Sequence, residues 1–167
     1  MLRFLAWARA FNATSATDAW ALGNTSDPGT RLGQSPLRSP SVFNFFRPGY
    51  VPPNSGIASA GLVAPEFQIT NESSVIGYLN YMQRAVSTGF GDVLADYTGL
   101  LALADNAQAL IDELNLVLAA GQIGATNLAT IKAALDSMAS GTDTARRNRV
   151  QAALVLVLAA PEFLVLK

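Results

Sequence analysis

The sequence predicts a mostly α-helical fold: a helical bundle of about five to six helices with a long extended strap and no substantial sheet. Two observations favour this fold class. Apolar residues recur every three or four positions over residues 71–160, which is typical of amphipathic helices. Residues 12–70 lack that period and are rich in Ser, Thr, Asn, Gly and Pro, which is typical of loops. We expect residues 1–167 to form a single helical domain that ends in a tail over residues 161–167.

A first helix is expected over residues 1–11. Its apolar residues fall near helical spacing and would form the packed stripe: Leu2, Leu5, Ala8 and Phe11. Arg9 interrupts the apolar run that a signal peptide would need, so an amphipathic helix is favoured and no signal peptide is expected in this chain.

Five further apolar stripes predict the helices of the bundle. They are Val75, Leu79, Met82 and Val86; Val93, Leu94, Tyr97, Leu100 and Leu101; Leu110, Ile111, Leu114, Val117 and Leu118; Leu128, Ile131, Leu135 and Met138; and Val150, Ala153, Leu154, Val157 and Leu158. Thr70 or Asn71 is the expected N-cap of the first of these helices. Short connections between helices of this length favour antiparallel neighbours.

Capping residues predict where several helices begin and end. Asp105, followed by Gln108, has the spacing of a capping box, and Thr126 is the expected cap of the next helix. Gly121 is expected to end the helix that starts near Asp105. Pro161 is expected to break the last helix.

The composition excludes several kinds of chemistry. The chain contains no cysteine and no histidine, so thiolate catalysis, disulfides, Cys/His zinc sites and a Ser-His-Asp triad are impossible within it. Its net charge of −1 gives no general attraction to phosphates, so nucleic acid is not an expected partner. The longest apolar run, residues 152–161, is about half the length of a membrane span, so no transmembrane span is expected. No motif indicates a cofactor or a metal site.

The segment 41–70, called the strap here, has two interpretations. Its aromatic rings and stiff prolines suit an extended element packed across the bundle. Alternatively, Asn44, Arg47, Tyr50 and Glu66 line a pocket for a sugar or an anionic ligand. The first interpretation predicts that these four side chains point apart or pair with one another, and the second predicts that they converge.

The strap also carries a family resemblance. It reads Ser-Val-Phe-Asn-Phe-Phe-Arg-Pro-Gly-Tyr-Val-Pro-Pro at 41–53 and Gly-Leu-Val-Ala-Pro-Glu-Phe-Gln-Ile-Thr at 61–70. These stretches resemble the C-terminal signature of the bacterial family called domain of unknown function 1800. The resemblance implies a C-terminal fragment of a larger protein that is exported from the bacterial cytoplasm, hence periplasmic or secreted, and it implies no known activity or catalytic residues.

Charged residues offer two weaker site hypotheses. Arg146, Arg147 and Arg149 lie near the start of the last helix, where they either pair with carboxylates of adjacent helices or bind an anion or a partner protein. Asp92 and Asp96 are spaced one helical turn apart and could together bind a cation, although two ligands make a poor site.

Two stretches echo each other, Leu-Val-Ala-Pro-Glu-Phe at 62–67 and Leu-Ala-Ala-Pro-Glu-Phe at 158–163. The preferred interpretation is a shared way of ending a segment. Pro halts the regular structure, Phe docks into the core, and Glu66 or Glu162 faces a backbone amide or an arginine.

Taken together, the sequence favours a non-catalytic structural or interaction module of a larger exported bacterial protein, and it leaves the biochemical function unknown. The expected partner is a missing N-terminal part of the same protein or another protein, and the oligomeric state is not set. An interface of this kind should leave Leu2, Phe4, Phe43 or Phe46 partly exposed. The alternative is a ligand-binding or enzymatic domain with its pocket in the strap.

Overall fold

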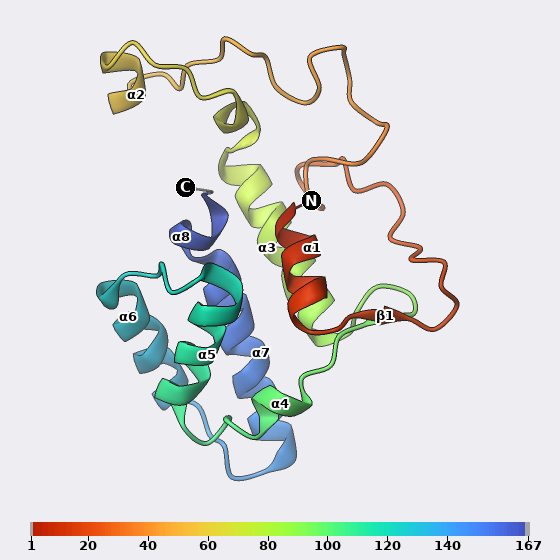
Figure 1. Cartoon of the computed structure of the whole chain (residues 1–167), viewed down its shortest axis with the longest axis vertical. Helices are drawn as coiled ribbons and strands as arrows, with labels where there is room; N and C mark the ends of the chain where they lie inside the picture. Colours follow the sequence, from red (N-terminus) through yellow and green to blue (C-terminus); the bar gives the residue numbers. More distant parts are fainter. Residues whose placement is uncertain (1, 166–167) are drawn as a thin grey trace. The chain divides into compact units, whose positions relative to one another are not determined.

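The computed structural model describes residues 2–165, and within that range the protein is mostly helical, as predicted (Figure 1). The α-helices are α1 (Leu2–Ala10), α2 (Gly56–Ser59), α3 (Glu72–Ser87), α4 (Thr98–Leu101), α5 (Ala107–Ala119), α6 (Ala125–Asp136), α7 (Asp143–Ala159) and α8 (Pro161–Leu164). A 3-10 helix, η1, spans Pro65–Ile69. The strands β1 (Thr14–Ser15) and β2 (Val93–Leu94) form a two-stranded sheet, in agreement with the expectation of no substantial sheet.

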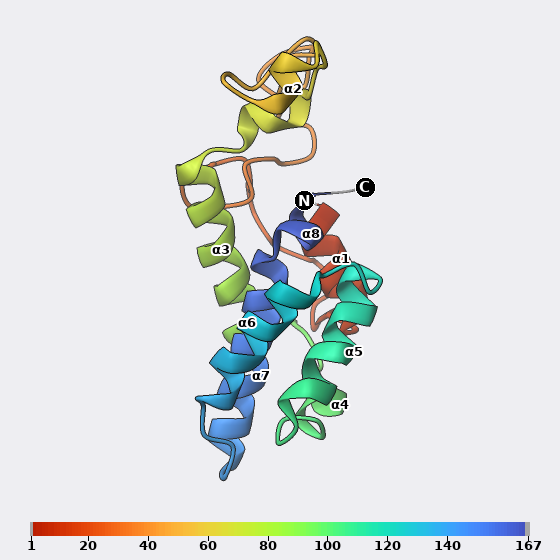
Figure 2. The same ribbon diagram turned by 90° about the vertical axis from the view of Figure 1, so that its left-hand side faces the viewer.

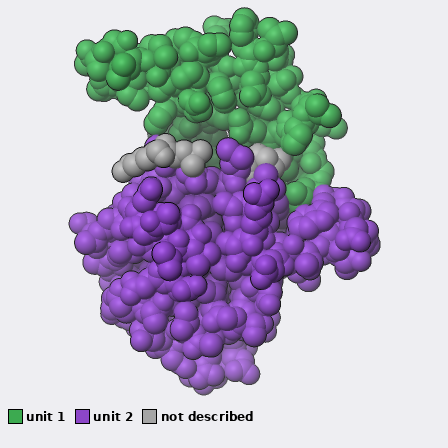
Figure 3. Space-filling model, in the orientation of Figure 1, with its two compact units in different colours: residues 1, 22–81 green, residues 2–21, 82–167 purple. Residues whose placement is uncertain are grey.

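The described chain divides into two compact units, which Figure 3 shows in different colours. Unit 1 contains residues 22–81, and unit 2 contains residues 2–21 together with residues from 82 onward. The boundary falls within α3, so residues 72–81 of this helix belong to unit 1 and residues 82–87 belong to unit 2.

Unit 2 is a helical bundle with one hydrophobic core. Its helices α5, α6 and α7 pack against one another in pairs, α1 packs on α5, α4 packs on α7, and α8 packs on both α5 and α7 (Figures 1 and 2). The largest fully buried side chains of the core are Phe4, Trp7, Met82, Val93, Leu110, Ile111, Leu114, Leu135, Val150, Leu154, Leu158 and Phe163. The apolar stripe predicted for the last helix is buried in full.

The face with which α1 packs is predicted only in part, because Ala8 and Phe11 are buried as expected but Leu2 and Leu5 are not. Phe4, Trp7 and Ala8 are its buried residues, whereas Leu2 and Leu5 are exposed. Phe4 and Trp7 have ring centroids 5.3 Å apart. The larger apolar area of two aromatic rings outweighs that of two leucines when the helix settles on the bundle. The expectation that Phe4 stays partly exposed is therefore wrong.

Asn71 caps α3 as expected, because its Oδ1 accepts from the amide of Ser74 at 3.0 Å, whereas two other N-caps lie one or two residues before the predicted ones. Asn106, and not Asp105, is the N-cap of α5, and its side chain accepts a hydrogen bond from the amide of Ala109 at 3.1 Å. Gly124 is the N-cap of α6, so Thr126 lies within that helix. Helix α5 ends at Ala119, close to the predicted end at Gly121. Its C-cap, Ala120, has a left-handed conformation.

The helix predicted over residues 93–101 forms only in its second half, as α4. Val93 and Leu94 instead form β2, which pairs antiparallel with β1, Ser15 opposite Val93. A tight turn precedes the strand, in which the amides of Phe90 and Val93 donate to each other's carbonyls at 3.2 and 2.9 Å. Two aliphatic residues suit either a strand or a helix, and the turn at Gly89 and Gly91, both with positive φ, decides for the strand.

Unit 1 consists mostly of hydrogen-bonded loops. The loop at 25–34 is closed by the Thr25 hydroxyl, which donates to the carbonyl of Gln34 at 2.6 Å. The strap folds back on itself, because the amide of Ala64 donates to the carbonyl of Tyr50 at 2.9 Å and the amide of Arg47 donates to Gln68 Oε1 at 2.7 Å. The stretch 12–70, expected to be loop throughout, thus also contains β1, α2 and η1.

The C-terminal tail expected over residues 161–167 is helical over Pro161–Leu164, as α8. Pro161 ends α7 as predicted but also opens α8, because proline is well accommodated at the first position of a helix. Phe163 of α8 is fully buried. Residues 166 and 167 lie outside the described residues.

Candidate ligand cavity

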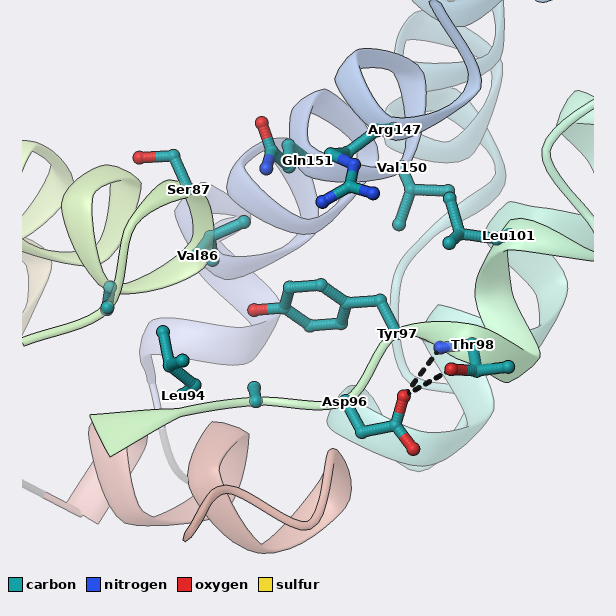
Figure 4. Close-up of a pocket in the computed structure, with 13 residues that line it drawn as sticks. Val86, Ser87, Leu94, Asp96, Tyr97, Thr98, Leu101, Arg147, Val150 and Gln151 are labelled. Atoms are coloured by element: carbon teal, nitrogen blue, oxygen red, sulfur yellow. Dashed lines mark hydrogen bonds between the residues drawn. The ribbon is translucent and has the colours of Figure 1, made fainter. Parts of the chain in front are cut away.

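A cavity of about 310 Å³ lies in unit 2, where the end of α3, the segment from β2 to α4, and α7 meet (Figure 4). Its volume is at the lower end of the range for small-molecule sites. The lining residues are Ala85, Val86, Ser87, Gly89, Leu94, Ala95, Asp96, Tyr97, Thr98, Leu101, Arg147, Val150 and Gln151.

Tyr97 is the most constrained polar residue of this cavity. Its hydroxyl oxygen accepts a hydrogen bond from the indole nitrogen of Trp7 at 3.0 Å, and its ring packs edge-on against Phe11 at 5.5 Å between centroids. Burial raises the pKa of Tyr97 well above its ordinary value. The residue is therefore a neutral phenol at pH 7, and its O–H has no acceptor among the described residues.

Asp96 supplies a negative charge to the wall. One of its oxygens accepts from both the amide and the hydroxyl of Thr98, at 2.8 and 2.6 Å, as Figure 4 shows. These hydrogen bonds lower the pKa of Asp96. The carboxylate is thus ionised and held at the start of α4, on the opposite side of the Tyr97 ring from Arg147 in the view of Figure 4.

The three arginines of α7 have three different environments. Arg146 pairs with Asp105 at 2.9 Å and lies 3.7 Å from Asp143. Arg149 is buried and lies 3.5 Å from Asp136. Arg147 lines the cavity and has no ion pair with any residue of the described range. Pairing thus accounts for two of the arginines and leaves Arg147 with its charge available.

A second cavity of about 390 Å³ adjoins the first one. Ser87 and Gln151 line both cavities. The remaining lining residues of the second cavity are Gln83, Asn148, Ala152, Val155 and Leu156. The charged side chains, Asp96 and Arg147, therefore lie in the first cavity, whereas uncharged polar side chains and aliphatic side chains of α7 line the second.

The strap residues proposed as a site lie in unit 1, and none of them lines either cavity. The hydrogen bonds from the amide of Ala64 to Tyr50 and from the amide of Arg47 to Gln68 bring the stretch with Arg47 and Tyr50 beside the stretch with Glu66. Asn44 adopts a positive φ of 66° in a turn closed on Ser41. No side-chain hydrogen bond or ion pair joins any two of the four within residues 2–165. A pocket in the strap stays a prediction.

The two aspartates considered for a cation are separately engaged. Asp92 Oδ2 accepts from the hydroxyl of Ser15 at 2.8 Å and from the amide and hydroxyl of Thr17, both at 2.7 Å. Asp96 is occupied by Thr98, and the two residues flank β2 rather than sharing a helix. In the part of the chain that the structure describes, no group of three or more acidic side chains is placed to hold a metal ion.

Sequence reasoning found Arg147 but missed Tyr97 and Gln151 as cavity residues. Tyr97 was assigned to an apolar helical stripe, whereas in the structure it precedes α4 and lines the cavity together with Arg147. Gln151 carried one signal, because it lies four residues after Arg147 and so on the same face of the helix.

These features define a mostly α-helical protein with a cavity whose wall includes polar and charged side chains. The chain belongs to the family of proteins of unknown function called DUF1800, which matches residues 1–165, so the resemblance carried by the strap is confirmed. No curated protein and no solved structure matches the chain. Across the described residues, none of the helices is both long enough and apolar enough to cross a membrane.

Proposed function

We propose that this chain is a non-catalytic structural or interaction module of a larger exported bacterial protein, and that the strap docks on an apolar surface of its partner. The carrying observation is the exposure of large apolar side chains in the strap. They are Val42, Phe43, Val51, Leu62, Val63 and Phe67. Phe43 is 56% exposed and Leu62 is 59% exposed.

Unit 1 offers these side chains no core of its own. Among the described residues of unit 1, the one buried hydrophobic residue is Tyr81, at the boundary with unit 2. Contiguous exposed apolar surface is characteristic of interaction sites in soluble proteins. Docking on a partner would remove the strap's aromatic and aliphatic surface from water, and this burial would contribute a favourable free energy of roughly 25 cal/mol per Å².

Partial exposure was expected at four apolar positions if this chain has an interface, and three of them have it. Leu2 and Phe43 are exposed and Phe46 is half-buried, whereas Phe4 is in the core of unit 2. One backbone hydrogen bond and one bond to the side chain of Gln68 join the two halves of the strap, so the strap can present its side chains without first paying the full entropy of ordering.

Hydroxyl-radical footprinting tests the proposal. We expect Phe43 and Leu62 to be strongly labelled in the purified chain and protected in the native cell fraction, where the partner is present. Leu116, exposed on α5 of unit 2, is the control and should be labelled equally in both samples. Equal labelling of Phe43 in the two samples would contradict the docking role.

Export is a separate part of the proposal and comes from the family resemblance alone. Cell fractionation of the bacterial host with an antibody to this chain tests it. Recovery with periplasmic or secreted proteins is the expected result, and recovery with a cytoplasmic marker would contradict it.

A further inference from the structure

Two adjoining cavities of unit 2 form a groove with one charged end and one aliphatic end. Arg147 and Tyr97 lie at the first end, and Gln151 lines both cavities. Ala152, Val155 and Leu156 form the aliphatic part of the second end, beside the polar side chains of Gln83 and Asn148. We propose that this groove binds a medium-chain carboxylic acid, with the carboxylate at Arg147 and the alkyl chain along α7. The site is independent of the strap and of the proposed docking role.

The charged end can satisfy a carboxylate. Arg147 offers a planar guanidinium that no carboxylate within residues 2–165 occupies, and such a group binds carboxylates through paired hydrogen bonds. Tyr97 is a neutral phenol whose oxygen already accepts from Trp7, so its O–H is left to donate. Figure 4 shows Arg147 and Gln151 extending from α7 on the same side of the Tyr97 ring.

The charge of the wall favours a ligand with a single negative charge. Asp96 lines the same cavity as Arg147, and its hydrogen bonds with Thr98 keep it ionised. A dianion such as a phosphate monoester would add a second negative charge near this carboxylate, with only one unpaired cation to offset it. A monocarboxylate matches the one available guanidinium.

The aliphatic end sets the length of the ligand. Arg147, Gln151 and Val155 are spaced four residues apart, so they follow one face of α7. Eight residues of helix rise roughly 12 Å, which is the length of an extended chain of about eight to ten carbons. Such a chain would cover Ala152, Val155 and Leu156, which are only partly buried.

The side chain of Trp7 provides the readout. The chain has two tryptophans, so a ¹H–¹⁵N correlation NMR spectrum of the ¹⁵N-labelled full chain contains two indole N–H signals. Trp7 donates its indole N–H to the hydroxyl oxygen of Tyr97, and the Tyr97 O–H would in turn donate a hydrogen bond to a bound carboxylate. We expect octanoate to shift the Trp7 signal in a saturable way and to leave the signal of Trp20 unchanged.

A ligand series separates the two ends of the groove. Lengthening the acid from hexanoate to octanoate should tighten binding about tenfold, since each buried methylene contributes about threefold to fourfold. Octanamide has the same length without the charge and should bind at least about tenfold more weakly than octanoate. Inorganic phosphate should not compete.

Two neighbouring arginines supply the matched variants. Arg147→Gln should weaken octanoate binding about tenfold. Arg146→Gln removes the same charge from the same helix turn but outside the cavity, and it should change the affinity less than about twofold. Val155→Thr keeps the side-chain shape and should reduce the gain from hexanoate to octanoate, while hexanoate itself binds nearly as before.

Several results would overturn the proposal. They are the absence of a saturable Trp7 shift at about 10 mM octanoate, equal binding of octanoate and octanamide, or equal weakening by Arg147→Gln and Arg146→Gln. An unchanged far-ultraviolet circular dichroism spectrum and melting temperature for both variants would show that loss of binding is not loss of folding. Footprinting of the strap is unaffected by any of these outcomes, so the two proposals fail separately.

Discussion

The tetrapeptide Ala-Pro-Glu-Phe occurs once in each unit, at residues 64–67 of unit 1 and 160–163 of unit 2. In both places its proline opens a short helix, η1 or α8. The phenylalanines then differ, because Phe67 is 39% exposed and Phe163 is 0% exposed. The same local sequence thus gives the same kind of turn, and the surrounding helices decide whether its aromatic ring is buried.

The neighbours explain the difference. Helix α8 packs on α5 and α7, and the guanidinium of Arg3 lies 4.7 Å from the centroid of the Phe163 ring. Glu162 accepts hydrogen bonds from the amide of Gly124 at 3.1 Å and from Asn127 at 2.9 Å, as expected for the echo. Glu66 has no side-chain hydrogen bond within the described range.

Truncation of the two phenylalanines gives the largest expected contrast. Phe163→Ala should lower the free energy of unfolding by about 3–5 kcal/mol, since it leaves a cavity in a closed core. Phe67→Ala should change it by less than about 1 kcal/mol. Urea unfolding followed by the fluorescence of Trp7 measures both. A similar loss in the two variants would contradict the idea that only unit 2 has a core.

Regular periodicity explains which parts of the fold were predictable from sequence. Helices α5 and α7 were anticipated because their buried residues recur at every third or fourth position: Leu110, Ile111, Leu114 and Leu118 in α5, and Val150, Ala153, Leu154, Val157 and Leu158 in α7. Each of these helices has one continuous apolar face, so its neighbours can only pack on that face.

The errors fall where two apolar choices compete. Helix α1 has apolar residues on most of its surface, and the contact of Phe4 and Trp7 with the bundle selects the face. Val93 and Leu94 form a strand because the turn at Gly89 and Gly91 precedes them and because Ser15, distant in sequence, pairs with Val93. The part of such choices that depends on partners far along the chain is not recorded in a local pattern.

The candidate cavity was predictable in part. The run of three arginines predicted either pairing with carboxylates of adjacent helices or an anion or partner site, and no local pattern indicated that Arg146 and Arg149 would be paired while Arg147 would not. Those pairings depend on where α4, α5 and α6 place Asp105 and Asp136. The contribution of Tyr97 depends on its hydrogen bond with Trp7, ninety positions earlier in the chain.

Gly77→Ala tests whether unit 1 has any close packing, with the next largest effect. A methyl group at Gly77 would lie 2.5 Å from the carbonyl oxygen of Pro28 and 2.7 Å from the carbonyl carbon of Gly29. We expect the loop at 25–34 to separate from α3, at a cost of about 2 kcal/mol. Hydrogen exchange should become faster at Leu32, whose amide donates to the carbonyl of Thr25 at 3.1 Å.

The matched control for this variant is Gly56→Ala, at a glycine of unit 1 with no atom within 4 Å of the added methyl group. It should leave exchange at Leu32 unchanged. If Gly77→Ala also left it unchanged, unit 1 would lack even this one close backbone contact, and the contrast with unit 2 would be sharper than the structure indicates.

The two glutamates of the repeated tetrapeptide give a smaller contrast. Glu162→Ala removes the acceptor for Gly124 and Asn127 and should lower the free energy of unfolding by about 1–2 kcal/mol. Glu66→Ala should change it by less than about 0.5 kcal/mol. Both are measured in urea at pH 7. A larger loss from Glu66→Ala would mean that this carboxylate has a role in unit 1 that its exposed position does not indicate.

The smallest expected effect concerns pH and isolates the short sheet of unit 2. Hydrogen bonds from the side chain and then the amide of Thr17, with a further one from Ser15, lower the pKa of Asp92 from 3.8 to about 2. Because the folded pKa lies below the unfolded one, this contribution to stability is present above pH 3.8 and is lost as the pH falls toward 2.

Thr17→Val removes the strongest of these bonds, so the pKa of Asp92 should rise toward 3.8 in a carboxyl NMR titration. Asp92→Asn should in turn flatten the dependence of stability on pH across that window. A titration of Asp92 that is unchanged by Thr17→Val would show that β1 and the turn before β2 are not joined in solution as the structure places them.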